Sequence, residues 1–586
     1  MHNRSVRITV ITRFFAVLLF FLFFFISFLQ RHVYNYDFWW HLATGKYIVE
    51  HKSLPESDPF SYTSHETPTS RKLMILKGYW LAQVIFFRVY EKWDLAGITV
   101  LRAILMTLFL FFAFLTIKKQ GLPDLPALLL LTGVFVLSKS YLGERPQLFT
   151  FAFFSATLYL LEDFRVSRTK KIFLIPFLLL VLSNMHPGYI VCILLITLYA
   201  AGEGIRSLME RDAGRGSLKT LLLVWFLAVA ASMVNPVGSA VFAELSSLRQ
   251  HTRGIVEFMP PFSSYAEKLK PVDYPYVLFL VFSAGAVRYL KKIGAAPLLV
   301  AAVFACMSFT AIRYIIFYMC ASAPVIARVL VKAGEEKFLK RTEAFLDRRQ
   351  GILYALTFIF GVSLVLSSVT SLARYEFSAD TSFAAPKDAA DFLARLEIRG
   401  NMFNEYGFGG YLIWRLYPEK KVFIDGRSLE PPVYEEYMSI AFAREDPGRS
   451  WDDIMRGFDV SYLIAPPLRP RGELYPIIEK MLDRDDWVLI YRDQLALIFL
   501  RNTPGNAPII RQFAMDKSEA MNTIIVQASA RASKNRANPY YLITLGKVFY
   551  KMGRRTDAEK AFQMAYQRDP NNPVITESLR RLHETK

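Results

Sequence analysis

Long apolar runs separated by short polar connections fill the first part of the chain, up to about residue 373. The first run, residues 9–29, is long enough for a helix to cross a bilayer. Gln30, Arg31 and His32 follow it in place of a small-residue cleavage site, so it is interpreted as an uncleaved anchor instead of a signal peptide. The other apolar runs are residues 95–117, 123–141, 146–164, 172–185, 189–202, 219–235, 274–290, 296–311, 314–333 and 351–373. The pattern predicts a polytopic α-helical membrane bundle of about 11 spans over residues 1–373.

The charge of the connections predicts the orientation. If the N-terminus is cytoplasmic, every strongly basic connection is cytoplasmic as well: residues 118–119, 165–171, 206–219, 288–292 and 332–349. The opposite connections hold few lysines and arginines, so the positive-inside rule favours a cytoplasmic N-terminus and an extracytoplasmic C-terminal part. Residues 78–93 contain Arg88, Glu91 and Lys92 and are expected to form an amphipathic helix on the outer surface. Residues 30–94 then form one large outer loop.

Composition supports a membrane protein. The 586 residues are 53% hydrophobic and only 21% charged. The formal net charge of +19 would suggest nucleic acid in a soluble chain, but here the basic residues lie in loops and act as topology signals, so no nucleic-acid partner is expected. The three cysteines, Cys192, Cys306 and Cys320, lie inside apolar runs, so neither a disulfide framework nor a Cys-rich metal site is expected.

Beyond residue 373 the hydropathy falls, and residues 374–503 alternate short apolar strands with helical patterns. They predict a small extracytoplasmic α/β domain. The expected strands are 402–403, 421–425, 461–464, 487–491 and 495–500, and the expected helices are 386–397, 407–416, 432–443 and 473–483. Two glycine turns, residues 407–410 and 425–427, mark a candidate functional edge, because glycine permits close approach of a ligand or another chain. Simple loop geometry is the alternative.

Residues 504–586 predict a helical linker and a tetratricopeptide (TPR) unit. The repeat at 539–572 places small and aromatic residues at the spacing of two antiparallel helices: Leu545, Gly546, Phe549, Gly553, Ala558, Phe562, Ala565 and Pro570. Because about three such units are usually needed for independent stability, this one should pack on the helix expected at 508–534, on the α/β domain or on a partner protein. It is expected to serve docking and not catalysis.

Candidate chemistry follows the anchor, in residues 36–45 (Tyr-Asp-Phe-Trp-Trp-His-Leu-Ala-Thr-Gly). Asp37 and His41 are spaced i, i+4 and would share one face of a helix. Asp58 lies on the same predicted loop, so the two carboxylates could serve as general base and as second acid or ligand of a divalent cation such as Mg²⁺ or Mn²⁺. The alternatives are a helix N-cap for Asp37 and an ordinary turn former for Asp58.

Further polar groups should reach the outer ends of the spans: Arg145, His186 and Arg313. Guanidinium groups offer paired donors to a phosphate, so these residues are candidates for holding a lipid phosphate. The alternative for each arginine is a side chain that snorkels from a helix end to the interface.

An anchor, an outer loop that opens with an acid, a multi-span bundle and a C-terminal extracytoplasmic domain resemble the GT-C glycosyltransferase superfamily. The residues that carry the resemblance are the segment from Asp37 to Gly45 and Ser57-Asp58-Pro59-Phe60. Asn404-Glu405-Tyr406-Gly407 is also similar to the Trp-Trp-Asp-Tyr-Gly box of oligosaccharyltransferases, but without its tryptophans. The resemblance implies a sugar donor on a polyprenyl phosphate, Asp37 as the catalytic acid, and Arg145, His186 or Arg313 at the carrier phosphate. Many members carry a second acid beside the first, whereas Phe38 follows Asp37 here.

The leading hypothesis is therefore a glycosyltransferase of the bacterial cytoplasmic membrane. It would transfer a polyprenyl-linked sugar to an envelope glycan, lipid or protein at the extracytoplasmic face. One alternative is a non-catalytic scaffold of envelope polysaccharide assembly that recruits a protein partner through the TPR. Another is a transporter or flippase, although related halves with paired broken helices are not visible.

Overall fold

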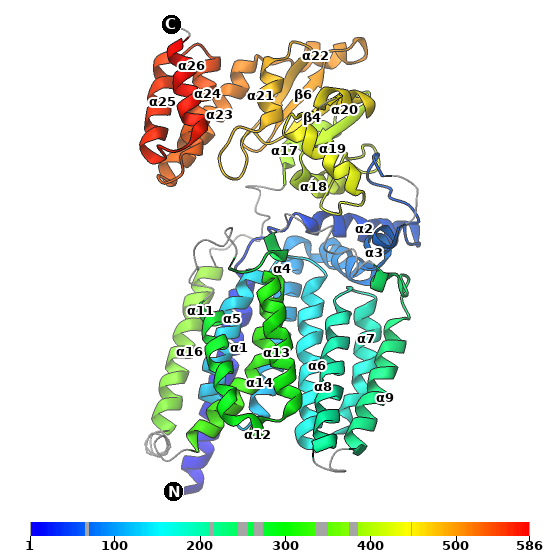
Figure 1. Cartoon of the computed structure of the whole chain (residues 1–586), viewed down its shortest axis with the longest axis vertical. Helices are drawn as coiled ribbons and strands as arrows, with labels where there is room; N and C mark the ends of the chain where they lie inside the picture. Colours follow the sequence, from blue (N-terminus) through cyan, green and yellow to red (C-terminus); the bar gives the residue numbers. More distant parts are fainter. Residues whose placement is uncertain are drawn as a thin grey trace. The chain divides into compact units, whose positions relative to one another are not determined.

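The computed structural model describes residues 2–64, 69–209, 215–243, 256–262, 274–335, 350–373, 385–446 and 448–584. The chain divides into two compact units (Figure 1). The first comprises Met1–Val33, Thr44–Leu54 and Pro68–Ala379, and the second comprises Tyr34–Ala43, Pro55–Thr67 and Asp380–Lys586. Two short pieces of the predicted outer loop therefore belong to the same unit as the C-terminal part of the chain.

The first unit is a bundle of helices, and each of the predicted apolar runs contains one. Its helices include α1 (His2–Leu29), α3 (Ser70–Lys77), α4 (Trp80–Lys118), α5 (Asp124–Ser138), α6 (Gln147–Ser167), α7 (Ile175–Ser183), α8 (Tyr189–Met209), α9 (Arg215–Ser232), α11 (Tyr274–Ala284), α12 (Leu290–Ile293), α13 (Ala295–Thr310), α14 (Ile315–Gly334) and α16 (Gln350–Leu372). The 3₁₀ turns described in this unit are η1 (Lys139–Tyr141), η2 (Lys170–Leu174), η3 (Val256–Phe258), η6 (Gly285–Tyr289) and η7 (Ile312–Tyr314).

Among the described residues, five helical segments are long and apolar enough to cross a membrane: Ser70–Lys118, Asp124–Tyr141, Tyr189–Met209, Ile312–Gly334 and Ala355–Leu372. Arg13–Leu29, Gly216–Ser232 and Ala295–Thr310 are apolar but shorter. Large apolar side chains such as Leu356, Phe360 and Leu366 of α16 are exposed, as expected of a helix that faces lipid. The chain is thus a membrane protein, while the number of spans stays a prediction.

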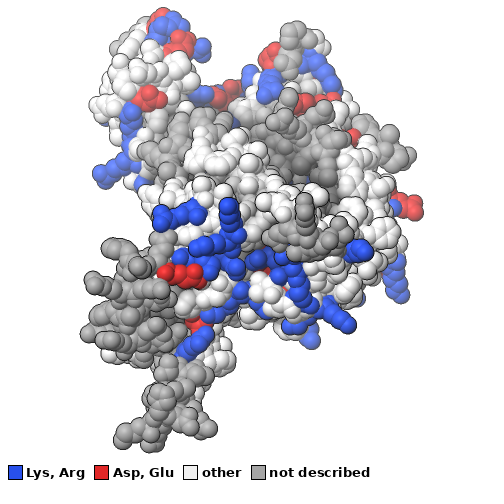
Figure 2. Space-filling view, turned by 60° about the horizontal axis from the view of Figure 1, so that its bottom comes forward, with Lys and Arg blue, Asp and Glu red and all other residues white. Residues whose placement is uncertain are grey.

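Lysine and arginine gather on one end of this unit (Figure 2). Here Arg168 and Arg206 share the carboxylate of Glu203, and Arg328 donates to the carbonyl of Lys292. Arg168, Arg206 and Lys292 lie in connections that the charge pattern assigns to the cytoplasm. Basic loops that are distant in sequence thus lie at one end of the bundle (Figure 2), while the orientation of the chain in the membrane stays a prediction.

Buried polar contacts hold the bundle together near the predicted outer loop. Arg102 of α4 forms a fully buried ion pair with Glu144 and donates to the carbonyl of Phe28 at the end of α1. Such a pair is costly to bury unless its hydrogen bonds are satisfied, so it fixes how these segments meet. Helix α4 has a kink at Asp94, where φ is 52°. This residue is at the end of the predicted outer loop.

The second unit is built on a mixed four-stranded sheet of order β1-β4-β6-β5. Its strands are β1 (Asn401–Asn404), β4 (Val460–Ala465), β5 (Trp487–Arg492) and β6 (Leu497–Arg501), and β2 (Glu445–Asp446) pairs with β3 (Arg449–Ser450) outside it. β1 and β4 are parallel, and the other pairs of the four-stranded sheet are antiparallel. The short apolar runs of the sequence correspond to these strands with one exception. Residues 421–425 form no strand, because Val422 makes only an isolated bridge to Ser61 of the outer-loop piece.

Helices cover this sheet and continue into the C-terminal region. They are α17 (Lys387–Ala394), η8 (Tyr406–Phe408), α18 (Gly409–Leu416), α19 (Pro431–Ala441), α20 (Trp451–Gly457), α21 (Pro476–Asp483), η9 (Pro504–Asn506), α22 (Ala507–Phe513), α23 (Lys517–Lys534), α24 (Tyr540–Lys551), α25 (Arg555–Arg568) and α26 (Pro573–Glu584). α2 (Asp37–His51) begins in this unit and ends in the first. The sequence predicted α17, α18, α19 and α21 but not α20.

The C-terminal helices share a hydrophobic core with the sheet domain. One continuous cluster of buried residues runs from Phe403 to Leu582. In the predicted repeat, Gly546 of α24 packs directly on the ring of Phe562 of α25, where a Cβ would lie 2.5 Å from the ring. Lys547 pairs with Glu479 of α21 at 3.0 Å, and Thr544 donates to the carbonyl of Gly472. The region thus packs on its own α/β domain, while its assignment as a TPR stays a prediction.

Candidate active site

Asp37 is the first residue of α2, and three aromatic side chains surround it. The indole Nε1 of Trp40 donates to Asp37 Oδ1 at 3.2 Å, and the Asp37 backbone amide is held by Asn35 Oδ1 at 2.9 Å. The rings of Tyr36 and Tyr406 meet edge to face, and burial together with the Asp37 carboxylate raises the pKa of Tyr406. The carboxylate is thus held among a few orienting groups, as a general base requires.

Glycines bring two turns close to this carboxylate. A Cβ on Gly426 would lie 2.1 Å from Asp37 Oδ1, and a Cβ on Gly410 would lie 2.7 Å from the carbonyl of Tyr36. Likewise, a Cβ on Gly409 would lie 2.2 Å from the carbonyl oxygen of Ile424. The glycine turns predicted from the sequence therefore serve close packing of three segments of this chain, and that packing fixes the surroundings of Asp37.

Asp58 lies in a sealed ion-pair cluster. Its Oδ1 accepts from Nη1 of Arg427 at 2.6 Å and its Oδ2 from Nη2 at 3.2 Å, while the amides of Phe60 and Ser61 donate to the same carboxylate. Arg427 also binds Asp425, with Nε to Oδ1 at 2.8 Å and Nη2 to Oδ2 at 2.7 Å. Burial alone would lower the pKa of Arg427, but Asp425 and Asp58 raise it. The cluster ties the outer-loop piece to the turn that contains Gly426.

The donor set does not fit a divalent cation. No group of three or more His, Cys, Asp or Glu side chains able to hold a metal exists among the described residues. The carboxylate oxygens of Asp58 already accept from a guanidinium, whose charge would repel a metal ion. His41 is 3% exposed and stacks on Trp40, with ring centroids 3.5 Å apart. The catalytic roles predicted for His41 and Asp58 stay predictions.

Glu405 is a further unusual carboxyl group in this unit. It accepts from the amide of Phe408 at 3.1 Å and adjoins the hydrogen-bonded hydroxyls of Tyr437 and Tyr475, which are 3.0 Å apart. Burial raises the pKa of Glu405 to about 7, although the amides of Phe408 and Gly407 oppose the shift. A carboxyl group that titrates near neutral pH is a candidate for proton transfer.

In the first unit, two of the predicted phosphate residues, Arg145 and Arg313, lie near one carboxylate, that of Glu257. Nη2 of Arg145 binds Glu257 Oε2 of η3 at 2.8 Å. The guanidinium of Arg313 lies 4.3 Å from the ring centroid of Phe258, the next residue. Burial would raise the pKa of Glu257, but Arg145 and Arg313 lower it. The pair is open to solvent, with 23% of the Arg145 side chain and 30% of the Glu257 side chain exposed.

His186 lies near Arg145 and Arg313, but its ring is uncharged. Burial, and after it Arg313 and Arg145, lower the pKa of His186 to about 3. Its Nδ1 accepts from the amide of Gly188 at 2.9 Å and lies 2.8 Å from the Thr150 hydroxyl. The proton of the neutral ring is therefore on Nε2, which can donate to an anion. The structure thus brings Arg145, His186 and Arg313 together, as sequence reasoning proposed.

Sequence reasoning did not identify Arg427 and Glu257 as partners of its candidates. Arg427 lies within a turn that the sequence did single out, but nothing in the sequence alone joins it to Asp58, 369 positions away. Glu257 lies in a polar segment between two apolar runs, where a carboxylate has no distinctive pattern. Glu405 had a local signal, because it precedes Tyr-Gly in the segment compared with the oligosaccharyltransferase box.

Comparisons with known proteins show a likeness of fold to an archaeal enzyme. No protein-family model matches the chain, and no curated protein matches it in sequence. Its fold is similar to a crystal structure of the Archaeoglobus fulgidus oligosaccharyltransferase tethered to an acceptor peptide, with a TM-score of 0.48 and 11% identity over 85% of this chain and 74% of that one. It is also similar to the oligosaccharyltransferase AglB of the same organism in complex with an inhibitory peptide and a dolichol-phosphate, with a TM-score of 0.47 and 12% identity over 79% and 69%. These likenesses concern the fold alone.

Proposed function

We propose that the chain is a GT-C-like membrane glycosyltransferase that transfers a sugar from a polyprenyl-phosphate-linked donor to an acceptor hydroxyl of the cell envelope. The observation that carries the proposal is the placement of Arg145 and Arg313 near the carboxylate of Glu257, with the neutral His186 near both arginines. Two guanidinium groups and a ring N–H provide the donors that a phosphate needs. They lie in connections between apolar helices, where a lipid phosphate would reach them.

Glu257 occupies the position of an anion in this arrangement. Its carboxylate has the charge sign and acceptor geometry of a phosphate oxygen pair, and its pair with Arg145 is partly exposed. Exposed ion pairs contribute only about 0–1 kcal/mol, so a doubly charged phosphate can replace the carboxylate. In the proposed reaction these cations stabilise the negative charge on the carrier phosphate as the sugar leaves.

Asp37 is the proposed general base. The acceptor oxygen forms a bond to the anomeric carbon, the bond from that carbon to the phosphate oxygen breaks, and the acceptor proton passes to a carboxylate oxygen of Asp37. The electron pair of the broken bond stays on the carrier phosphate. A positioned base of this type contributes about 10²–10⁴ in rate. Trp40 Nε1 orients the carboxylate, and the backbone at Gly426 limits its movement.

The sealed cluster of Asp58, Arg427 and Asp425 is assigned a positioning role in this proposal. It holds the Gly426 turn, which lies directly against Asp37. The reaction is written without a metal, because Asp58 is already neutralised by Arg427. By the charge pattern, the N-terminus lies in the cytoplasm of a bacterium and the second unit lies outside its cytoplasmic membrane.

The proposal is tested with the purified full chain in lipid nanodiscs supplied with a polyprenyl-linked sugar fraction and an envelope glycan fraction, as donor and acceptor, from bacterial membranes. Release of polyprenyl phosphate is measured for the wild type and for Asp37→Asn. Loss of the base should lower the rate at least about 100-fold, while the isosteric amide preserves the fold. Asp485→Asn removes an exposed carboxylate of the same unit and serves as the matched control.

Equal rates for Asp37→Asn and the wild type would contradict the catalytic assignment. The scaffold alternative predicts in addition that cells carrying Asp37→Asn make envelope glycan normally at normal protein levels. Accumulation of a labelled polyprenyl-linked sugar on one side of the membrane without transfer would instead support a flippase.

A further inference from the structure

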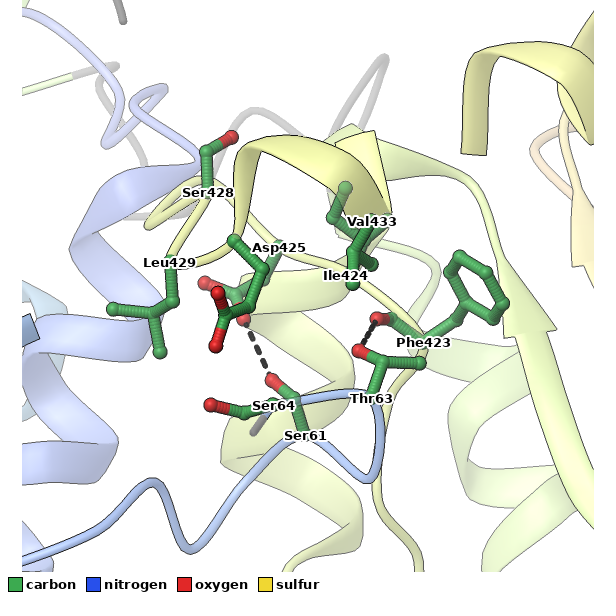
Figure 3. Close-up of a pocket in the computed structure, with 10 residues that line it drawn as sticks. Ser61, Thr63, Ser64, Phe423, Ile424, Asp425, Ser428, Leu429 and Val433 are labelled. Atoms are coloured by element: carbon green, nitrogen blue, oxygen red, sulfur yellow. Dashed lines mark hydrogen bonds between the residues drawn. The ribbon is translucent and has the colours of Figure 1, made fainter. Parts of the chain in front are cut away.

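Hydroxyl groups line a small hollow in the second unit, but the chain itself uses them (Figure 3). The Ser61 hydroxyl donates to Asp425 Oδ2 at 3.4 Å, and the Thr63 hydroxyl donates to the Phe423 carbonyl at 2.6 Å. The hollow has room for about one water molecule. The basic side chains at one end of the first unit differ, because their positive charge exceeds the negative charge beside them.

These basic side chains come from the ends of α6, α8 and α14, where lysine and arginine gather (Figure 2). Arg168 at the C-cap of α6 lies 3.6 Å from Glu203 of α8, and Arg206 lies 2.6 Å from the same carboxylate. Arg165 of α6 interacts electrostatically with Glu203 and with Arg328 of α14. Three helices therefore supply the charges of one cluster.

The connection between α12 and α13 and the last turn of α14 extend this cluster. The carbonyl of Lys292, at the end of α12, accepts from Nε of Arg328 at 3.3 Å. Lys332 of α14 binds Glu335 Oε1 at 2.6 Å. Glu335 also interacts electrostatically with Lys292 and Arg328, so these side chains belong to the same cluster.

The cluster has an excess of positive charge. Its described members are the cations Arg165, Arg168, Arg206, Lys292, Arg328 and Lys332 and the carboxylates Glu162, Glu203 and Glu335. The adjacent Asp163 has its own cation, Lys119. Among the described residues, Arg328 forms no direct ion pair, and the buried Nε of Arg206 has no hydrogen-bond acceptor. The cluster is therefore able to attract an anion.

Exposed apolar side chains adjoin these cations. Leu208, two residues after Arg206 on α8, is 85% exposed. Val287 and Leu290, which precede Lys292, are 73% and 49% exposed. A small soluble anion would use only the cations. A phospholipid would use both kinds of group, because its phosphate can meet the cations while its acyl chains cover the apolar side chains.

We propose that this cluster binds the headgroup of an anionic phospholipid in the leaflet at this end of the bundle. Guanidinium groups offer paired donors to a phosphodiester. Arg145 lies just before α6 and Arg165 lies in its last turn, so about 30 Å of helix separate the cluster from the proposed site of the carrier phosphate. The inference goes beyond the proposed function and does not depend on it.

The test measures lipid binding to the full chain in detergent by native mass spectrometry. The probes are dioleoyl-phosphatidylglycerol and, as a lipid without net charge, dioleoyl-phosphatidylcholine. The wild type should prefer phosphatidylglycerol. Arg206→Gln combined with Arg328→Gln should weaken phosphatidylglycerol binding about 30-fold, at about fivefold for each charge, and should leave phosphatidylcholine binding unchanged.

The matched control removes two charges elsewhere. Arg88→Gln combined with Lys92→Gln changes the first part of α4, whereas Lys118 at the other end of α4 lies near the cluster, next to Lys119. This control should bind phosphatidylglycerol as the wild type does. Arg168→Gln guards against misfolding, because its side chain is 41% exposed, and it should weaken binding about fivefold.

Three results would overturn the lipid site. They are equal affinity of the wild type for the two lipids, phosphatidylglycerol binding unchanged in both cluster variants, and an equal loss in the control. Glycerol 1-phosphate is the headgroup without acyl chains. If it displaced phosphatidylglycerol at an equal concentration, the occupant would be a soluble anion and the proposal would be wrong.

Discussion

The two units use the same chemical pair, an arginine with carboxylates, in opposite ways. In the second unit Arg427 and Asp58 are each 1% exposed, and each binds the other through two hydrogen bonds. In the first unit Arg145 and Glu257 are 23% and 30% exposed and share one contact of 2.8 Å. The first pair is closed to any ligand, whereas the second can exchange its carboxylate for another anion.

We propose that the buried pair positions the surrounding chain and that the partly exposed pair binds a ligand. Removing one partner of a sealed pair leaves a buried charge and destabilises the fold strongly, while an open pair contributes little stability. We therefore propose that a phosphate binds at the partly exposed Arg145 and not at the buried Arg427. Substitutions in the two pairs should therefore differ in the size of their effect and in whether they change stability or binding.

The largest effect is expected for Arg427→Ala. It leaves Asp58 and Asp425 buried without their counter-ion, which should cost about 3–5 kcal/mol of the stability of the second unit. Hydrogen exchange of residues 55–67 and 421–430 in the full chain measures the loss. Arg88→Ala removes an arginine from an exposed pair with Glu91 and should change little. Equal protection in both variants would remove the distinction between sealed and open pairs.

Arg145→Ala should affect binding and not folding. Loss of a guanidinium donor is expected to weaken polyprenyl phosphate binding about 10- to 100-fold, because a charged hydrogen bond contributes about 1.5–3 kcal/mol. The thermal midpoint should shift by less than about 2 °C, as for an exposed pair. Isothermal titration in nanodiscs and a melting curve measure the two quantities. A large drop in the midpoint with unchanged affinity would identify Arg145 as structural.

Glu405 differs from the carboxylates of both pairs. It accepts from backbone amides and, among the described residues, forms no ion pair. Its pKa of about 7 in the folded chain exceeds its ordinary value of 4.5, so the protonated form is favoured in the folded state. Stability should therefore fall as pH rises from about 4.5 through about 7, by on the order of 3 kcal/mol. Unfolding at pH 5 and pH 8 measures this, and Glu405→Gln should abolish the difference. An unchanged pH dependence in that variant would assign it to other groups.

The sequence predicted the positions of helices and strands better than the contacts between segments that are distant in sequence. Apolar periodicity and basic loops were enough to locate the helices of the first unit, because a bilayer demands long apolar runs and marks their ends with charge. The run at 421–425 looked like a strand, yet its backbone groups are used by residues 60–63 of a distant loop. Contacts across such sequence distances depend on tertiary packing that single-sequence patterns do not encode.

The candidate site shows the same limit. Arg145, His186 and Arg313 could be grouped from the sequence because all three lie in connections assigned to one side of the membrane. The carboxylate near the two arginines could not be found, since Glu257 lies in a segment with no repeating pattern. Asp58 and Arg427 show the same limit for an ion pair: the acid stands out in the sequence, but its counter-ion, 369 positions away, does not.

The most direct test of exchange at the open pair is polyprenyl phosphate affinity in Glu257→Gln compared with the wild type. If the carboxylate competes with the phosphate for Arg145 and Arg313, its removal should tighten binding, by up to about fivefold for a pair of this exposure. Weaker binding in Glu257→Gln, or affinity identical in Glu257→Gln, Arg145→Ala and the wild type, would contradict the account that these arginines hold the carrier phosphate.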